Sequence, residues 1–155
     1  MKKEDVKVKK LNNKGFSLVE IIIVIAIMAV LAGALAPQLI KYIDKSRKAA
    51  DIQTAQTIAM AANTALADEA GYATANNTKL SDCYNSSGTN AFQDKIKEIL
   101  GGTSGVKPKS KEYADFLITY SAGKGIEIYA TNEVSATPTP VLADQLYPEL
   151  GDKFK

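Results

Sequence analysis

The chain has 155 residues, of which 46% are hydrophobic, and its formal net charge is +2. This length fits one membrane segment and one small domain, because domains commonly run to about 100–150 residues. The sequence has no histidine, and Cys83 is its single cysteine. His-based catalytic triads and an intramolecular disulfide are therefore excluded, and we expect neither a zinc or other transition-metal site nor a cofactor.

The charges are unevenly distributed along the chain. Residues 1–15 hold six lysines and two acidic residues, a net charge of +4, which leaves −2 for the remainder. A mildly acidic remainder gives no reason to expect nucleic-acid binding. The basic leader precedes an apolar run, so the positive-inside tendency predicts that this end stays in the cytoplasm and the rest faces outward. The six lysines of this leader are Lys2, Lys3, Lys7, Lys9, Lys10 and Lys14.

Residues 16–36 form the apolar run FSLVEIIIVIAIMAVLAGALA. At a rise of about 1.5 Å per residue, a helix of this length reaches about 30 Å, the hydrocarbon thickness of a bilayer. It has no polar face on which it could lie along a surface, so we expect it to span the membrane. Glu20 is the one charge in the run. An intramembrane carboxylate is a functional candidate, although a glutamate that merely reaches the headgroup level is the alternative.

An ordinary secretory signal peptide is a competing interpretation of the same run. It would use residues 21–30 as its apolar core and the small residues 34–36 as its cleavage site. The charge of Glu20, the position of Pro37 directly after that cut, and the continuing helical pattern all speak against it.

The segment KGFSLVE, from Lys14 to Glu20, resembles the cleavage and assembly motif of type IV pilins. Pro37 also stands where these pilins have a proline, and the resemblance covers Lys10 to Ala70. It implies that a membrane peptidase cuts between Gly15 and Phe16 and then N-methylates Phe16. It further implies that Glu20 meets the free amino group of Phe16 on a neighbouring subunit and so sets the register of a filament.

The single cysteine departs from the many pilins that close a C-terminal loop with a disulfide. In this respect the chain resembles subunits of Gram-positive bacteria. The whole pattern is similar to that of a type IVa-like major pilin precursor with a class III signal peptide.

Residues 37–70 are predicted to be the amphipathic half of one long helix. Pro37 lacks an N–H donor and clashes with the preceding turn, so we expect a kink or local unwinding from Gly33 to Pro37. Gly71 is predicted to end the helix. An apolar stripe contains Ile52, Ala55, Ala59, Ala62 and Leu66, whereas Asp51, Gln53, Thr54, Thr57 and Asp68 lie off it.

Residues 71–155 are predicted to form a globular head. Residues 72–90 read as an irregular connection, and residues 91–100 as a short amphipathic helix. Strands are expected at 113–121 and 126–131, joined as a hairpin. The lysines at 107, 109 and 111 read as a solvated loop or as a small basic patch for DNA or a negatively charged surface. The segment from Asn132 onward is left with two alternatives, a position on the sheet or an exposed region. The fold class is α+β, with the long N-terminal helix packed on a small antiparallel sheet as in the pilin fold.

No spacing in the sequence brings together a nucleophile, a base and a charge stabiliser, so no enzyme is expected. The resemblance implies a structural subunit of a type IV pilus for adhesion, motility or aggregation. A pseudopilin or competence-pilus subunit is the near alternative, and a monomeric membrane-anchored or secreted binding module is the distant one. The implied partners are other copies of the chain, the prepilin peptidase, an assembly platform protein, an assembly ATPase and, before assembly, membrane lipid. The implied location is a single-pass plasma-membrane precursor and then an extracellular filament.

Overall fold

The computed structural model describes residues 15–67, 77–85, 91–102, 105–121, 123–133 and 138–155. Contacts within the chain group into two units, Met1–Lys41 and Tyr42–Lys155. The described part of the first unit is helical from Leu18 onward, and the sheet and the hydrophobic core belong to the second. The leader predicted at residues 1–15 lies outside the described residues except for Gly15.

Helix α1 (Leu18–Leu66) runs without interruption through Gly33 and Pro37. The local unwinding expected there is therefore not observed, because Pro37 removes one hydrogen bond, to the Gly33 carbonyl, while the bonds on either side hold the helix. A bend at Pro37 stays a prediction. The helix ends at Leu66, where the Ala67 N–H contacts the carbonyls of Asn63 and Thr64 at 3.2 and 3.3 Å. The end predicted at Gly71 falls outside the described residues.

Two elements occupy the region that the sequence analysis treated as irregular. They are strand β1 (Thr78–Lys79) and helix α2 (Leu80–Asn85), so the expectation of a structureless connection was wrong for residues 78–85. Their partners are distant in sequence: Lys79 pairs with Leu117, and the Ser81 N–H donates to the Asp115 carboxylate at 3.2 Å. Helix α3 (Ala91–Leu100) confirms the predicted short helix.

The remaining elements complete a four-stranded antiparallel sheet in the order β1-β2-β3-β4. Strands β2 (Asp115–Ser121) and β3 (Gly125–Thr131) form the predicted hairpin, in which Ser121 faces Gly125. A 3₁₀ turn, η1 (Leu142–Asp144), leads into the short strand β4 (Gln145–Tyr147). The sheet and the long helix thus confirm the α+β architecture predicted from the sequence.

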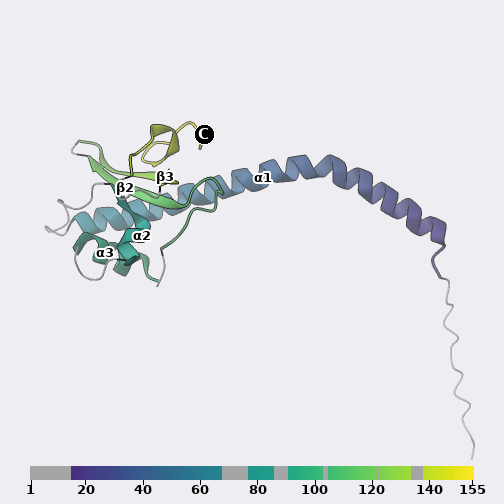
Figure 1. Cartoon of the computed structure of the whole chain (residues 1–155), viewed down its shortest axis with the longest axis horizontal. Helices are drawn as coiled ribbons and strands as arrows, with labels where there is room; N and C mark the ends of the chain where they lie inside the picture. Colours follow the sequence, from purple (N-terminus) through teal and green to yellow (C-terminus); the bar gives the residue numbers. More distant parts are fainter. Residues whose placement is uncertain (1–14, 68–76, 86–90, 103–104, 122, 134–137) are drawn as a thin grey trace, which may run out of the picture. The chain divides into compact units, whose positions relative to one another are not determined.

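The core lies between the sheet and the second half of α1, beside which β2, β3, α2 and α3 are drawn in Figure 1. The alanine-rich stripe of α1 packs in the core, as predicted, with Ile52 half-buried and the other four members buried. Small side chains let the sheet approach the helix closely. Asp51 was expected off this stripe, yet it is only 1% exposed. The core includes Ala55, Ile58, Ala59, Ala62, Leu80, Phe92, Ile96, Phe116, Ile118 and Ile128.

The C-terminal segment contacts α1 and the residues just before β2 through a group that we name the C-terminal clasp: Lys48, Tyr113, Asp144, Lys153 and Phe154. The Phe154 ring stacks on Tyr113 with centroids 5.6 Å apart. The Tyr113 hydroxyl donates to Asp144 at 2.7 Å, and Lys153 pairs with the same carboxylate at 2.8 Å. The Lys48 ammonium donates to the Lys153 carbonyl at 2.6 Å.

Candidate processing and assembly site

The first half of α1 presents apolar side chains on every side, and none of them is buried. Residues 15–46 are all exposed, and Phe16 and Leu18 are 84% and 75% exposed. In the part of the chain that the structure describes, α1 is the one helix long and apolar enough to cross a membrane, with a mean hydropathy of 2.9 in its most apolar window. So large an apolar surface requires lipid or protein to cover it.

The bond between Gly15 and Phe16, where the resemblance implies cleavage, precedes the helix. Gly15, Phe16 and Ser17 have no regular secondary structure, and both residues of the bond are exposed. A Cβ atom added to Gly15 would have no neighbour within 4 Å. Packing within the chain therefore does not require glycine at this position. A requirement for glycine would come from the enzyme that binds the segment.

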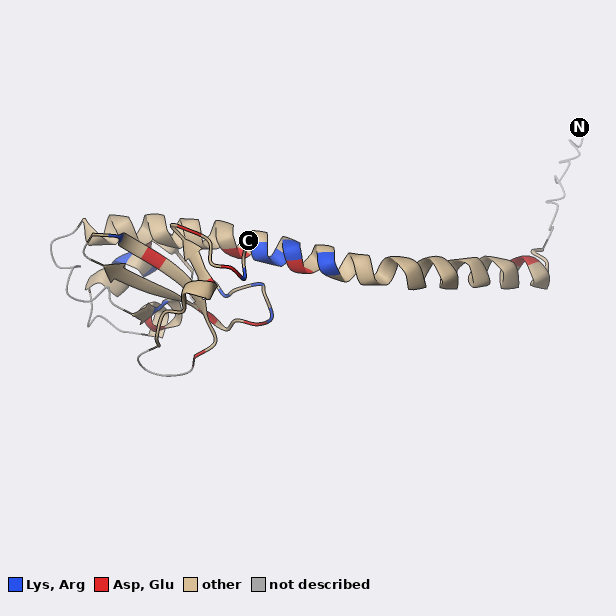
Figure 2. Ribbon diagram, turned by 90° about the horizontal axis from the view of Figure 1, so that it is seen from above, with Lys and Arg blue, Asp and Glu red and all other residues tan. Residues whose placement is uncertain are grey.

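Glu20 closes the first turn of α1 by bonding to its own chain. The Ser17 N–H donates to the Glu20 carboxylate at 2.9 Å, and the Ser17 carbonyl accepts the first helical bond from the Ile21 N–H at 3.3 Å. Ser17 is thus the N-cap and Glu20 the third residue of the helix, which is one half of a capping box. The carboxylate also lies at the positive end of the helix dipole, where a negative charge is stabilised. Glu20 is the acidic residue in the first turn of α1, and Figure 2 shows an acidic band near the start of this helix.

The capping role of Ser17 and Glu20 was not predicted from the sequence. The signal was present, because serine followed three residues later by glutamate, directly before an apolar run, is the pattern of a capping box. The structure places Phe16 beside this box in sequence but shows no contact between its side chain and Glu20 within the described residues. A contact between Glu20 and the amino group of Phe16 on another copy remains a prediction.

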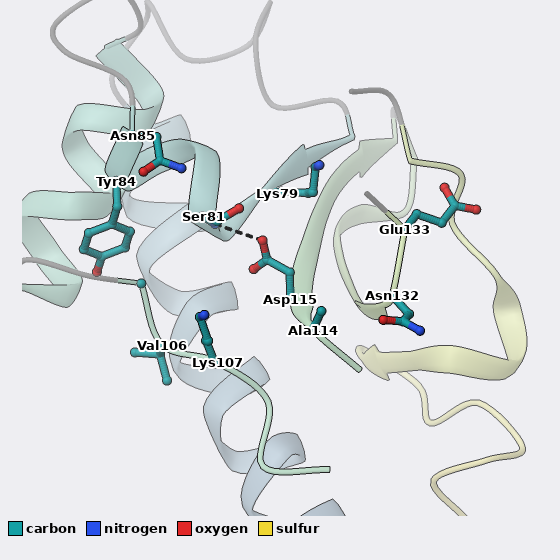
Figure 3. A pocket seen from close by; sticks show the side chains of 11 residues that line it. Lys79, Ser81, Tyr84, Asn85, Val106, Lys107, Ala114, Asp115, Asn132 and Glu133 are labelled. Atoms are coloured by element: carbon teal, nitrogen blue, oxygen red, sulfur yellow. Dashed lines mark hydrogen bonds between the residues drawn. The ribbon is translucent and has the colours of Figure 1, made fainter. Parts of the chain in front are cut away.

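The head contains a cleft of about 420 Å³ between α2, residues 105–107, the start of β2 and the end of β3 (Figure 3). Its two carboxylates are already engaged: Asp115 accepts the N–H groups of Ser81 and Phe116, and Glu133 accepts the N–H and hydroxyl of Thr139. These carboxylates hold backbone segments in place. Among the described residues, no group of three or more potential metal ligands is arranged to hold a metal ion.

Cys83 lies on α2 and is buried. Burial, and then the negative charges of Asp82 and Asp115, raise the pKa of its thiol to about 12. A thiol with such a pKa is almost entirely protonated at neutral pH, and the thiolate is the reactive form. Cys83 therefore behaves as a small core residue.

Residues 10–36 match the family model of the prokaryotic N-terminal methylation motif. No match was found among the curated proteins or among the solved structures. The motif spans the bond between Gly15 and Phe16, the capping box and the whole apolar run. It points to a structural protein and supports a membrane-anchored precursor of the pilin or pseudopilin type, processed by a prepilin peptidase. The chain thus carries at residues 10–36 the class III signal peptide of type IV pilins, and the apolar part of this motif is the start of the long helix α1.

Proposed function

We propose that this chain is a subunit of a type IV pilus, anchored in the plasma membrane as a precursor and then polymerised into a surface filament. The observation that carries the proposal is the methylation motif at residues 10–36 joined to a helix whose apolar side chains are all exposed up to residue 46. In the precursor, lipid covers this surface. In the filament, the helices of other copies cover it instead.

Processing is the first step of the proposed function. The prepilin peptidase cuts between Gly15 and Phe16 in the irregular segment before α1, and the new amino group of Phe16 is N-methylated. Removal of the leader takes away its net charge of +4. The ammonium group of Phe16 is then the nearest cation to Glu20 in sequence.

Glu20 has two partners in this scheme. One carboxylate oxygen holds the Ser17 N–H at 2.9 Å. The other accepts no hydrogen bond from the residues that the structure describes, and it is free to meet the ammonium group of Phe16 on the next copy. An unpaired carboxylate is strongly disfavoured in an apolar medium, so this pairing drives the entry of one subunit beside another and fixes the register between them.

The experiment that tests the proposal is mass spectrometry of the N-terminus of protein sheared from cells. We expect the chain to begin at N-methylated Phe16. A chain that begins at Pro37, or that retains Met1, would overturn the proposal in favour of a secreted or anchored domain. The amount in the sheared fraction separates a major pilin, which is abundant there, from a pseudopilin or competence-type subunit, which is scarce.

Glu20→Gln and Glu20→Ala separate assembly from processing. Both variants lose the negative charge, but glutamine keeps an oxygen that can accept the Ser17 N–H. We expect both to be inserted and cut and neither to form filaments. Normal filaments from Glu20→Gln would show that the cap, and not the charge, is what assembly requires.

A further inference from the structure

A second cleft, of about 270 Å³, lies at the base of the head, where residues 44–48 of α1 meet residues 110–112. It is lined by Asp44, Arg47, Lys48, Ser110, Lys111 and Glu112. Figure 2 shows basic segments with acidic ones among them on this part of α1, after the uncharged stretch. The two segments are held together by the buried Asp51 carboxylate, which accepts the N–H groups of Lys109 and Ser110 at 2.6 and 2.9 Å.

Ser110 is the unusual residue of this cleft. It is 6% exposed, and its hydroxyl oxygen is the one buried side-chain polar atom without a hydrogen-bond partner among the described residues. A buried hydroxyl normally finds a partner, because burial without one costs free energy. Its backbone N–H is held by Asp51, and rotation about the Cα–Cβ bond can turn the hydroxyl toward the cleft that Ser110 lines.

Two cations in the cleft are available beside this hydroxyl. Lys111 makes no hydrogen bond or ion pair within the described residues. Arg47 contacts Asp44 at 3.4 Å, but 34% and 58% of their side chains are exposed, and such a pair contributes only about 0–1 kcal/mol. An anion with several oxygens can therefore replace Asp44 at little cost. Lys48 is already committed to the Lys153 carbonyl.

We propose that this cleft binds a phosphate group, with Arg47 and Lys111 pairing with its oxygens and the Ser110 hydroxyl donating to it. Arginine matches phosphate geometry with two parallel N–H donors. Three carboxylates oppose the anion: Asp44 and Glu112 at the cleft, and Asp51 behind it. The charge of Asp51 is already met by two backbone N–H groups, and Asp44 is free to turn toward water.

The phosphate can come from a lipid headgroup or from a soluble or polymeric ligand. Arg47 lies eleven residues beyond Ala36, up to about 16 Å along the helix at 1.5 Å per residue. The headgroup layer extends only about 5–7 Å beyond the hydrocarbon on each side. A lipid phosphate thus reaches the cleft only if the helix leans strongly at the membrane surface.

The test is calorimetric titration of the full chain in dodecyl maltoside micelles with inorganic phosphate, with ionic strength held constant by potassium chloride. We expect saturable binding that Arg47→Gln and Ser110→Ala each weaken about tenfold, the loss of one charge-assisted hydrogen bond. Lys45→Gln is the matched control, because Lys45 is exposed on the same turn and does not line the cleft. We expect it to change the affinity less than twofold.

The urea midpoint of Ser110→Ala distinguishes phosphate binding from a structural role of Ser110. The affinity of Lys45→Gln distinguishes this site from a general attraction of phosphate to basic residues. Without phosphate, Ser110→Ala should leave the urea midpoint of unfolding unchanged or raise it, because it removes an unpartnered hydroxyl. The absence of saturable binding, an equal loss in Lys45→Gln, or a marked drop of that midpoint would overturn the proposal.

The source of the phosphate is resolved by repeating the titration in phosphatidylglycerol nanodiscs. A several-fold weaker apparent affinity than in micelles means that lipid phosphate occupies the site, and an equal affinity means that the ligand is soluble or polymeric. Binding in the micelles supports the site in either case. This result is independent of the N-terminal mass that tests the pilus proposal.

Discussion

Replacement of Asp51 by asparagine is expected to destabilise the head more than any other single change of charge on α1. Asp51 is 1% exposed and accepts two backbone N–H groups, at 2.6 and 2.9 Å, from a loop 58 and 59 residues away. A hydrogen bond to a charged group contributes about 1.5–3 kcal/mol. Asparagine keeps one accepting oxygen but turns its NH₂ group toward a second N–H. We therefore expect a loss of about 2–4 kcal/mol, a large part of a typical stability of 5–15 kcal/mol.

Urea unfolding of the full chain in maltoside micelles, followed by near-ultraviolet circular dichroism of tyrosine, measures this loss. All seven tyrosines lie after Lys41, and there is no tryptophan, so the signal reports the head and not the apolar run. Asp44→Asn is the control, because Asp44 is exposed and its pair with Arg47 contributes about 0–1 kcal/mol. A difference between the two variants below about 0.5 kcal/mol would refute the assigned role of Asp51.

Three further measurements address the C-terminal clasp and the core. Phe154→Ala should lower the free energy of unfolding by about 3 kcal/mol, whereas Leu142→Ala, at an exposed site, should change it by less than about 0.5 kcal/mol; equal effects would contradict the packing of Phe154. Burial and the hydrogen bond to Asp144 raise the pKa of Tyr113. The stabilisation that the protonated Tyr113 hydroxyl gives to the fold is therefore complete below about pH 10, the pKa of tyrosine in the unfolded chain, and is lost as the pH rises further. Stability measured from pH 9 to 11.5 should therefore fall less steeply in Tyr113→Phe than in the unchanged chain. Because the pKa of Cys83 is raised to about 12, a thiol reagent at pH 8 should label the native chain at least about 100-fold more slowly than the urea-unfolded chain, and similar rates would exclude its burial.

The elements that the sequence predicted correctly are those whose signals are local. The apolar run, the alanine stripe, the amphipathic helix at residues 91–100 and the hairpin all have periodicity within one segment. In the hairpin, Gly123 and Gly125 adopt positive φ values of 104° and 80°, which agrees with the turn expected from their sequence. Periodicity within one segment is enough to predict which of its residues face the core, even when the segment that packs against it is unknown.

The features that were not predicted depend on contacts between residues far apart in the sequence. Strand β1 has two residues, and they are a strand only because Ile118 and Leu117 pair with them. Asp51 looked like a surface residue because it lies off the apolar stripe, and its burial depends on two backbone amides from a distant loop. Lys153 and Phe154 gain their places from Lys48 and Tyr113. The cap at Ser17 and Glu20 differs from these, since its pattern is local and readable from the sequence.

The distribution of lysine and arginine implies that the leader has to remain in place until the helix has crossed the membrane. Before the apolar run stand the six lysines of residues 1–15. After it, within residues 37–51, stand Lys41, Lys45, Arg47 and Lys48. In the precursor, six basic residues precede the apolar run and four follow it within residues 37–51, so the positive-inside tendency favours export of the head. After cleavage none precedes it and four follow it, so the tendency opposes export.

Replacement of the leader lysines at 7, 9, 10 and 14 by glutamine leaves two basic residues before the apolar run against four after it. We expect a substantial fraction of that variant to insert with its head in the cytoplasm, measured by the activity of an export-dependent reporter fused after Lys155. The same four positions changed to arginine should export normally, and the glutamine variant should recover when Lys45, Arg47 and Lys48 are also changed to glutamine. Full export of the glutamine variant would show that the charge of the leader does not determine orientation, and that the apolar run or the export machinery does.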